Sequence, residues 1–213
     1  MKPHFITLEG SEACGKSTQI ERLKARLEAR GDTVLLTREP GGTALGETLR
    51  HLLKHAPEGR DMCPEAELLL FTASRAQLCR EVIAPTLAAG GWVISDRFGD
   101  STTVYQGVAR KLAPADVTSI NNFAMGTIRP TLTIVLDLDP EEAKRRLLRR
   151  PRPVGQATDR MEDQPAEFFD RVRDGYRALA EAEPDRVKLI SAAGKLNEVE
   201  ETIWSLVTHA FSL

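Results

Sequence analysis

The first strong pattern in this chain is the segment Gly10-Ser11-Glu12-Ala13-Cys14-Gly15-Lys16-Ser17, which fits the phosphate-binding pattern G-x-x-x-x-G-K-S/T. Residues 5–8 before it are apolar and β-branched, which predicts a buried strand. After it, Ile20, Leu23 and Leu27 recur at helical spacing, and we expect this helix to end at Gly31. This order of strand, loop and helix favours a true phosphate-binding loop over a chance match.

The loop suits a nucleotide polyphosphate for physical reasons. Glycines leave room for backbone N–H groups to surround phosphates, and the following helix directs its positive end at the same anion. Lys16 is expected to reach the β- and γ-phosphates, and the Ser17 hydroxyl to bind Mg²⁺. The predicted ATP-binding residues are Gly10, Ser11, Glu12, Ala13, Cys14, Gly15, Lys16, Ser17 and Thr18.

Length and composition are those of an ordinary globular domain. The 213 residues are 41% hydrophobic and 28% charged, and their formal net charge is -2. This charge does not favour a large nucleic-acid surface, and no apolar run is long enough to predict a membrane span. The three cysteines lack C-x-x-C spacing, which is typical of reduced thiols. We therefore expect one cytoplasmic domain over residues 1–213 that binds neither nucleic acid nor membrane.

Strand and helix patterns alternate along the chain. Further strands are predicted at residues 33–37, 92–95, 131–137 and 187–190. The alternation predicts a three-layer α/β/α P-loop NTPase fold with a five-stranded parallel sheet. Thr43 is expected to cap one helix, and Pro85 to kink a long one over residues 65–89. Residues 149–164 combine Pro, Gly and charge without periodicity and are expected to form a flexible lid.

Charged residues directly follow the predicted strands, where parallel strands end at one edge of the sheet. Asp96 is expected to help Ser17 hold Mg²⁺, the alternative being a helix cap. Asp137 leaves the next strand in the same manner and competes for the metal role. Arg38 and Arg97 also follow strands, and guanidinium groups bind phosphate oxygens bidentately. Two arginines at this edge indicate a second phosphate besides that of ATP.

Two further groups suit an acceptor and a transferring phosphate. Phe71 and Arg75 are four positions apart and share a helix face, where a ring can stack on a base and a guanidinium can bond its edge. The alternative is that Phe71 belongs to the core. The lid arginines can stabilise a transferring phosphoryl group, unless they form only a solvated basic loop. They are Arg149, Arg150, Arg152 and Arg160.

Taken together, these motifs resemble those of bacterial thymidylate kinases, which are P-loop nucleoside monophosphate kinases. The resemblance covers essentially the whole chain, and its most specific block is Arg38-Glu39-Pro40-Gly41-Gly42-Thr43. It also rests on Leu8-Glu9-Gly10 through Ser17-Thr18, Phe71-Thr72-Ala73-Ser74-Arg75-Ala76-Gln77, Asp96-Arg97-Phe98, Tyr105-Gln106-Gly107 and Asp159-Arg160.

The resemblance implies transfer of the ATP γ-phosphoryl group to dTMP, with Mg²⁺, giving dTDP and ADP for dTTP synthesis. It implies that Phe71 stacks on thymine and that Arg75 bonds a thymine carbonyl group. Thr102 and Gln106 fall where the family reads the base edge.

For the sugar and phosphate, the resemblance implies a different set of contacts. Arg38 and Arg97 would hold the dTMP phosphate, and Glu12 would meet the 3′-hydroxyl group. Tyr105 would crowd the 2′ carbon and disfavour ribonucleotides.

The resemblance also implies where the catalytic charges and the partner lie. The P-loop contains no arginine, so the chain resembles the family version whose catalytic arginines lie in the lid. The implied catalytic residues are Lys16, Arg97, Arg149, Arg152 and Arg160. A homodimer formed through helices, including the one around residues 68–87, is also implied.

Two other functions remain open at this point. One is a kinase for another nucleoside or nucleotide, whose acceptor site would show no preference for thymine. The other is a P-loop switch or regulatory ATPase, which would hydrolyse nucleotide slowly without an acceptor and would not need Phe71, Arg75 or Tyr105.

Overall fold

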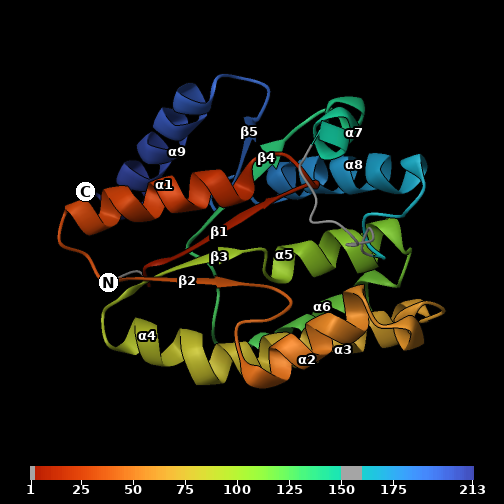
Figure 1. The fold of residues 1–213 in the computed structure, drawn as a ribbon. Helices are drawn as coiled ribbons and strands as arrows, with labels where there is room; N and C mark the ends of the chain where they lie inside the picture. The colour runs from red at the N-terminus through yellow and green to blue at the C-terminus, as the bar shows by residue number, and fades with distance from the viewer. Residues whose placement is uncertain (1–2, 150–159) are drawn as a thin grey trace.

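Five parallel strands form one sheet in the order β2-β3-β1-β4-β5 (Figure 1). The computed structural model describes residues 3–149 and 160–213. The expected α/β fold with a five-stranded parallel sheet is confirmed, and β1, which leads into the P-loop, is the central strand. The strands are β1 (Phe5–Gly10), β2 (Val34–Arg38), β3 (Trp92–Asp96), β4 (Leu132–Asp137) and β5 (Val187–Ser191).

Helices cover both faces of the sheet (Figure 1), which explains why its central strands are apolar runs rather than alternating patterns. Ile6, Ile94 and Ile134 face the core beneath α1 (Lys16–Ala29) and α9 (Leu196–Phe211). Phe5 and Val93, next to them in sequence, face the opposite core. Successive strand residues point to opposite faces, so both faces of each central strand are buried.

The second face is covered by helices that include α3, which carries the predicted site residues Phe71 and Arg75. α3 (Pro64–Leu78) packs against α2 (Ala44–Lys54) and α6 (Pro114–Met125). The remaining helices are η1 (Pro57–Gly59), η2 (Cys79–Ile83), α4 (Ala84–Ala88), α5 (Gly99–Thr102), η3 (Thr103–Ala109), α7 (Pro140–Arg149) and α8 (Ala166–Ala182).

Local sequence signals account for several helix boundaries. Thr43 caps α2 as predicted, because its hydroxyl oxygen accepts a hydrogen bond from the Gly46 N–H. One helix kinked at Pro85 was predicted over residues 65–89. The structure instead has three consecutive segments there, α3, the π-helical turn η2 and α4, and η2 precedes Pro85. In that turn the Ala84 N–H donates to the Cys79 carbonyl group. The wider turn fits a proline that lacks an N–H donor.

The lid prediction is only partly covered by the structure. Arg149 ends α7, and Arg160 follows the undescribed stretch, whereas Arg150 and Arg152 lie outside the described residues. Across residues 3–149 and 160–213, no helix has the length and apolarity needed to cross a bilayer.

Candidate active site

The P-loop joins β1 to α1 in a conformation that requires glycine. Gly10 has a φ of 133°, and a Cβ atom there would lie 2.6 Å from the Leu136 carbonyl oxygen. Gly15 has a φ of 98° immediately before α1. Glycine tolerates such conformations because it has no Cβ atom. The loop backbone can therefore approach an anion closely at the N-terminus of α1.

Lys16 is the first residue of α1, and its ammonium group contacts the P-loop backbone. Its Nζ donates to loop carbonyl oxygens, including that of Ser11 at 2.8 Å. Burial and the nearby charge of Arg97 would lower the pKa of Lys16, but its interactions with Cys14, Glu12 and Asp96 raise it above its usual value. Lys16 is therefore a stable positive charge within the loop, as a phosphate site requires.

Asp96 ends β3 next to Leu8 of β1 and brings a carboxylate to the P-loop edge. Its Oδ1 is buried and has no hydrogen-bond partner among the described residues. A buried carboxylate oxygen without a partner is energetically costly, and a cation or its water shell would remove that cost. Ser17 directly follows Lys16 in the first turn of α1 and has an exposed side chain. The pair fits Mg²⁺, which commonly binds one or two protein oxygens together with substrate phosphates.

Asp137, the competing metal candidate, is already paired. It accepts hydrogen bonds from Arg173 at 2.7 Å and from Arg177 at 2.9 Å, both on α8. Partial burial alone would raise the pKa of Asp137, but these arginines lower it below its usual value. Within the described ranges, no group of three or more His, Cys, Asp or Glu side chains is arranged to hold a metal. The unpaired oxygen of Asp96 is thus the better candidate ligand.

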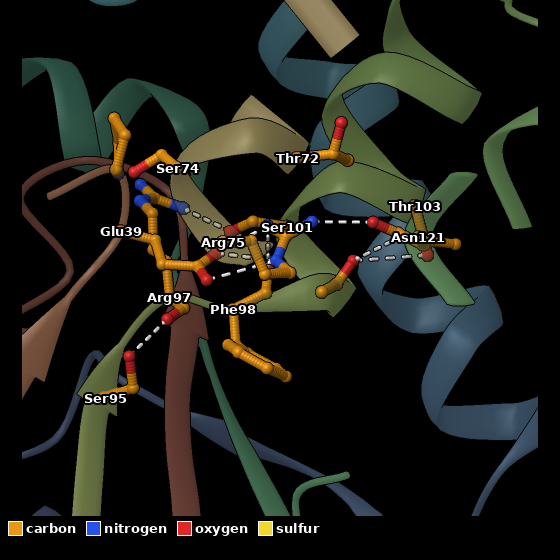
Figure 2. Close-up of polar contacts among 12 residues, drawn as sticks. Glu39, Thr72, Ser74, Arg75, Ser95, Arg97, Phe98, Ser101, Thr103 and Asn121 are labelled. Carbon is orange, nitrogen blue, oxygen red and sulfur yellow. Dashed lines mark hydrogen bonds and ion pairs between the residues drawn. The ribbon is translucent and has the colours of Figure 1, made fainter. Parts of the chain in front are cut away.

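Arg97 follows β3 in a strained backbone conformation. Its φ is 72°, in the left-handed region that residues other than glycine rarely adopt. The Ser95 hydroxyl donates to its carbonyl oxygen at 2.6 Å (Figure 2), and its N–H donates to the Leu8 carbonyl group at 3.0 Å. Backbone strain of this kind persists where surrounding bonds enforce it, and it is common at binding sites.

The Arg97 guanidinium lies between two side chains of the predicted site. Its Nη2 donates to Glu12 Oε1 at 2.7 Å, and its Cζ lies 5.0 Å from the centre of the Tyr105 ring. Burial alone would raise the pKa of Glu12, but Arg97 and Lys16 lower it to about 2. Glu12 therefore stays ionised near neutral pH and can accept a hydrogen bond from a hydroxyl group.

A buried carboxyl group, Glu9, binds residues that in turn contact Arg97. Glu9 accepts hydrogen bonds from the Phe98 N–H at 2.8 Å, the Ser101 hydroxyl at 2.6 Å and the Tyr176 hydroxyl at 2.7 Å. Burial is the main cause that raises the pKa of Glu9 to about 7. Arg97 Nη1 lies 3.3 Å from Ser101 Oγ and 3.4 Å from the Tyr176 oxygen. Sequence reasoning gave Glu9, Ser101 and Tyr176 no role, because their contacts link distant parts of the chain.

Six predicted substrate residues, from five different segments, line one cavity of about 40 Å³ next to the P-loop. Phe71 comes from α3, whereas Tyr105 and Gln106 come from η3. The cavity therefore brings together an aromatic ring, a fixed guanidinium and a carboxylate. Its lining residues are Glu12, Glu39, Pro40, Lys54, Phe71, Arg97, Ser101, Thr102, Tyr105, Gln106 and Met161.

The other two predicted substrate residues do not line this cavity. Arg75 is buried and bonded to its surroundings: Nε donates to Glu39 at 2.9 Å, Nη1 to Asn121 at 2.6 Å and Nη2 to the Phe98 carbonyl oxygen at 3.1 Å (Figure 2). Arg38 is half exposed, and its guanidinium pairs with Glu47 at 2.9 Å.

The two lid arginines that the structure describes lie in different surroundings. Arg149 is exposed at the C-terminal end of α7. Arg160 is largely buried; its Nη2 lies 2.6 Å from Glu67, and its Nε donates to the Leu53 carbonyl oxygen at 3.0 Å. Contact between Arg160 and a phosphate would therefore require release from Glu67.

A parallel sheet with a P-loop, beside a separate cavity that contains an arginine and an aromatic ring, is the arrangement expected of a P-loop nucleoside monophosphate kinase. Residues 8–203 match the family model described as thymidylate kinase. The chain belongs to the thymidylate kinase family. It phosphorylates dTMP to dTDP with ATP as the donor, which decides against the switch protein and against a kinase for another nucleotide.

Individual relatives agree with this assignment over nearly the full chain. The chain is 49% identical over 203 residues to a thymidylate kinase of Synechococcus sp. (strain JA-2-3B'a(2-13)), covering 95% of this chain and 93% of the relative. It is 43% identical over 210 residues to a thymidylate kinase from Syntrophotalea carbinolica, covering 98% of this chain and 97% of the relative. A crystal structure of thymidylate kinase from Ehrlichia chaffeensis superimposes with a TM-score of 0.76 at 31% identity, covering 96% and 97%.

Proposed function

We propose that the cavity between the P-loop, α3 and η3 binds dTMP. In this proposal Phe71 stacks on thymine, and Arg97 holds the phosphate. Glu12 accepts a hydrogen bond from the 3′-hydroxyl group, and Tyr105 lies against the 2′ carbon. The observation that carries the proposal is the Arg97 guanidinium, which Glu12 and Tyr105 hold at the cavity wall beside the P-loop.

Arg97 can engage a phosphate without losing its main anchor. Its bond to Glu12 is short, whereas its Nη1 contacts of 3.3 and 3.4 Å are long for hydrogen bonds. The Nη1 donors are therefore the ones available for phosphate oxygens. Arg38 can join them at small cost, because its pair with Glu47 is exposed and such pairs contribute only about 0–1 kcal/mol.

For the base edge, we propose roles for Arg75, Thr102 and Gln106. Thr102 and Gln106 line the cavity. A guanidinium carries five N–H donors, and the bonds of Arg75 to Glu39, Asn121 and Phe98 leave one Nη1 hydrogen over. Because Arg75 does not line the cavity, its bond to a thymine carbonyl group requires a shift of the side chains between them.

The chemistry needs no general base. The acceptor oxygen belongs to a phosphate whose second pKa is about 6, so it is already ionised near neutral pH. Rate enhancement then comes from alignment of the reactants and from positive charge around the transferring group. We propose that Lys16, Arg97 and the lid arginines Arg149, Arg152 and Arg160 supply that charge.

We further propose that Ser17 and Asp96 hold Mg²⁺ next to the ATP phosphates bound by residues 10–18. The unpaired Asp96 Oδ1 supports this role. When bound, Mg²⁺ neutralises charge on the phosphate oxygens. The P-loop supplies the remaining contacts through its backbone and Lys16.

We also propose that the chain forms a homodimer through α3 and α6. The two helices pack side by side on the same side of the sheet (Figure 1). Each exposes a large apolar side chain, Leu69 at 55% and Phe123 at 85%. Exposed apolar side chains on adjacent helices support a protein interface there.

The acceptor site is tested by comparing the binding of dTMP and thymidine by calorimetry. Wild type is expected to prefer dTMP, and Arg97→Ala to lose most of that preference while its thymidine affinity changes little. The matched control is Arg129→Ala, which removes an exposed arginine that does not line the cavity. An unchanged ratio of the two affinities in Arg97→Ala would rule out Arg97 as a phosphate ligand.

A further inference from the structure

Glu67 is a buried carboxylate behind the proposed base-binding cavity. It lies on α3, one helical turn before Phe71, and its side chain is 1% exposed. It accepts a hydrogen bond from Gln106 Nε2 at 2.7 Å and from Arg110 Nη2 at 3.1 Å. Arg160 Nη2 lies 2.6 Å from Glu67 Oε2, the same oxygen that accepts from Arg110 Nη2.

These partners keep Glu67 ionised. Burial alone would raise the pKa of Glu67, but the hydrogen bonds from Arg110 and Gln106 and the charges of Arg110 and Arg160 lower it below its usual value. An ionised carboxylate has no hydrogen to donate, so it accepts only. The group of Gln106 that meets Glu67 must therefore be the amide NH₂ group.

This contact fixes which end of Gln106 is left for a ligand. Gln106 is 1% exposed and lines the cavity. Because its NH₂ group is bonded to Glu67, its carbonyl oxygen Oε1 is the end that remains. Among the described residues, the side-chain hydrogen bond of Gln106 is the one that its Nε2 donates to Glu67, and none is donated to its Oε1. The cavity therefore offers a hydrogen-bond acceptor at Gln106.

We propose that Glu67 determines pyrimidine specificity by orienting Gln106 as an acceptor for the N3–H of thymine. Thymine carries a hydrogen on N3, whereas cytosine has a bare N3 acceptor in its place. With cytosine bound, its N3 and the Gln106 Oε1 would both be acceptors, so no hydrogen bond could form between them. Glu67 touches no substrate and is a positioning residue; the inference rests on the proposed dTMP site.

The size of the effect follows from the cost of an unpaired buried polar group. Such a mismatch costs enough to discriminate roughly tenfold to a hundredfold between two ligands. If Glu67 is replaced by a side chain that both donates and accepts, Gln106 can present either end. The preference for thymine over cytosine should then decrease by a factor of roughly tenfold to a hundredfold.

The test is the ratio of kcat/KM for dTMP to that for dCMP in wild type and in Glu67→Gln. We expect the ratio to fall at least tenfold, mainly through a higher KM for dTMP. Arg110→Lys is the matched control, because it weakens the same buried cluster but leaves Glu67 ionised. That control should lose thermal stability and keep the ratio within about twofold.

A ratio in Glu67→Gln within twofold of wild type would overturn the proposal, whatever happens to stability. If Glu67→Gln does not fold, Glu67→Asp replaces it: this acceptor-only side chain should keep the preference for dTMP, and its loss would also overturn the proposal. Phe71→Ala in the same assay tests the dTMP site itself and is expected to raise the KM for dTMP roughly tenfold. An unchanged KM there would refute the site rather than the role of Glu67.

Discussion

Glu9 gives a direct prediction for how the unfolding free energy depends on pH. It is a buried acid on the central strand, and its proton is lost near neutral pH in the folded protein. The pKa of Glu9 is raised from 4.5 to about 7, mainly by burial and also by the charge of Asp100. Between pH 4.5 and 7 the folded protein therefore binds more protons at Glu9 than the unfolded chain does. Stability from this group is complete below pH 4.5 and is lost as the pH rises to about 7.

The perturbation is Glu9→Gln, which keeps the shape of the side chain and removes its titration. A pKa difference of about 2.5 units corresponds to about 3 kcal/mol of unfolding free energy. The wild-type advantage over Glu9→Gln should fall by about that amount between pH 4.5 and 8. Other titrating groups are common to both proteins and cancel in the difference.

The assay is urea-induced unfolding at several pH values, followed by the fluorescence of Trp92, which is buried in β3, together with that of Trp204. Glu58→Gln, at an exposed position of η1, is the matched control and should follow wild type across the range. A stability difference between wild type and Glu9→Gln that stays constant from pH 4.5 to 8 would refute the reasoning.

Two further predictions concern the metal and a helix cap. Asp96→Asn should raise the Mg²⁺ concentration needed for half-maximal activity, because it weakens a proposed ligand; a Mg²⁺ titration checks this, and an unchanged midpoint argues against that role. Thr43→Ala removes the hydroxyl oxygen that accepts from the Gly46 N–H. It should lower the unfolding free energy by about 1 kcal/mol in urea, and no loss of stability would mean that the cap contributes little.

Local patterns were sufficient to predict most of the fold. The strand before Gly10 and the cap at Thr43 depend on residues close together in sequence, and the structure confirms them. The π-helical segments were not predicted, because their hydrophobic spacing differs little from that of an α-helix. The wide turn before Pro85 became visible only through its hydrogen bonds.

The site was harder to predict, because its supporting contacts join distant residues. Glu9 interrupts an apolar run in the sequence, yet it is fully buried, and Tyr176, one of its partners, lies 167 positions away. The spacing of Phe71 and Arg75 gave their shared helix face. It did not reveal that Glu39 binds the Arg75 guanidinium, which is a tertiary contact.

The central claim is that this chain transfers a phosphoryl group from ATP to a thymine nucleotide bound beside the P-loop. The most direct test is ADP release with ATP and Mg²⁺ in the presence of dTMP, dUMP, ribothymidine monophosphate, dGMP, AMP or no acceptor. We predict fast release with dTMP and much slower release with the ribonucleotide, because in the proposed site Tyr105 crowds the 2′ carbon. Equal, slow release with every acceptor and with none would contradict the account.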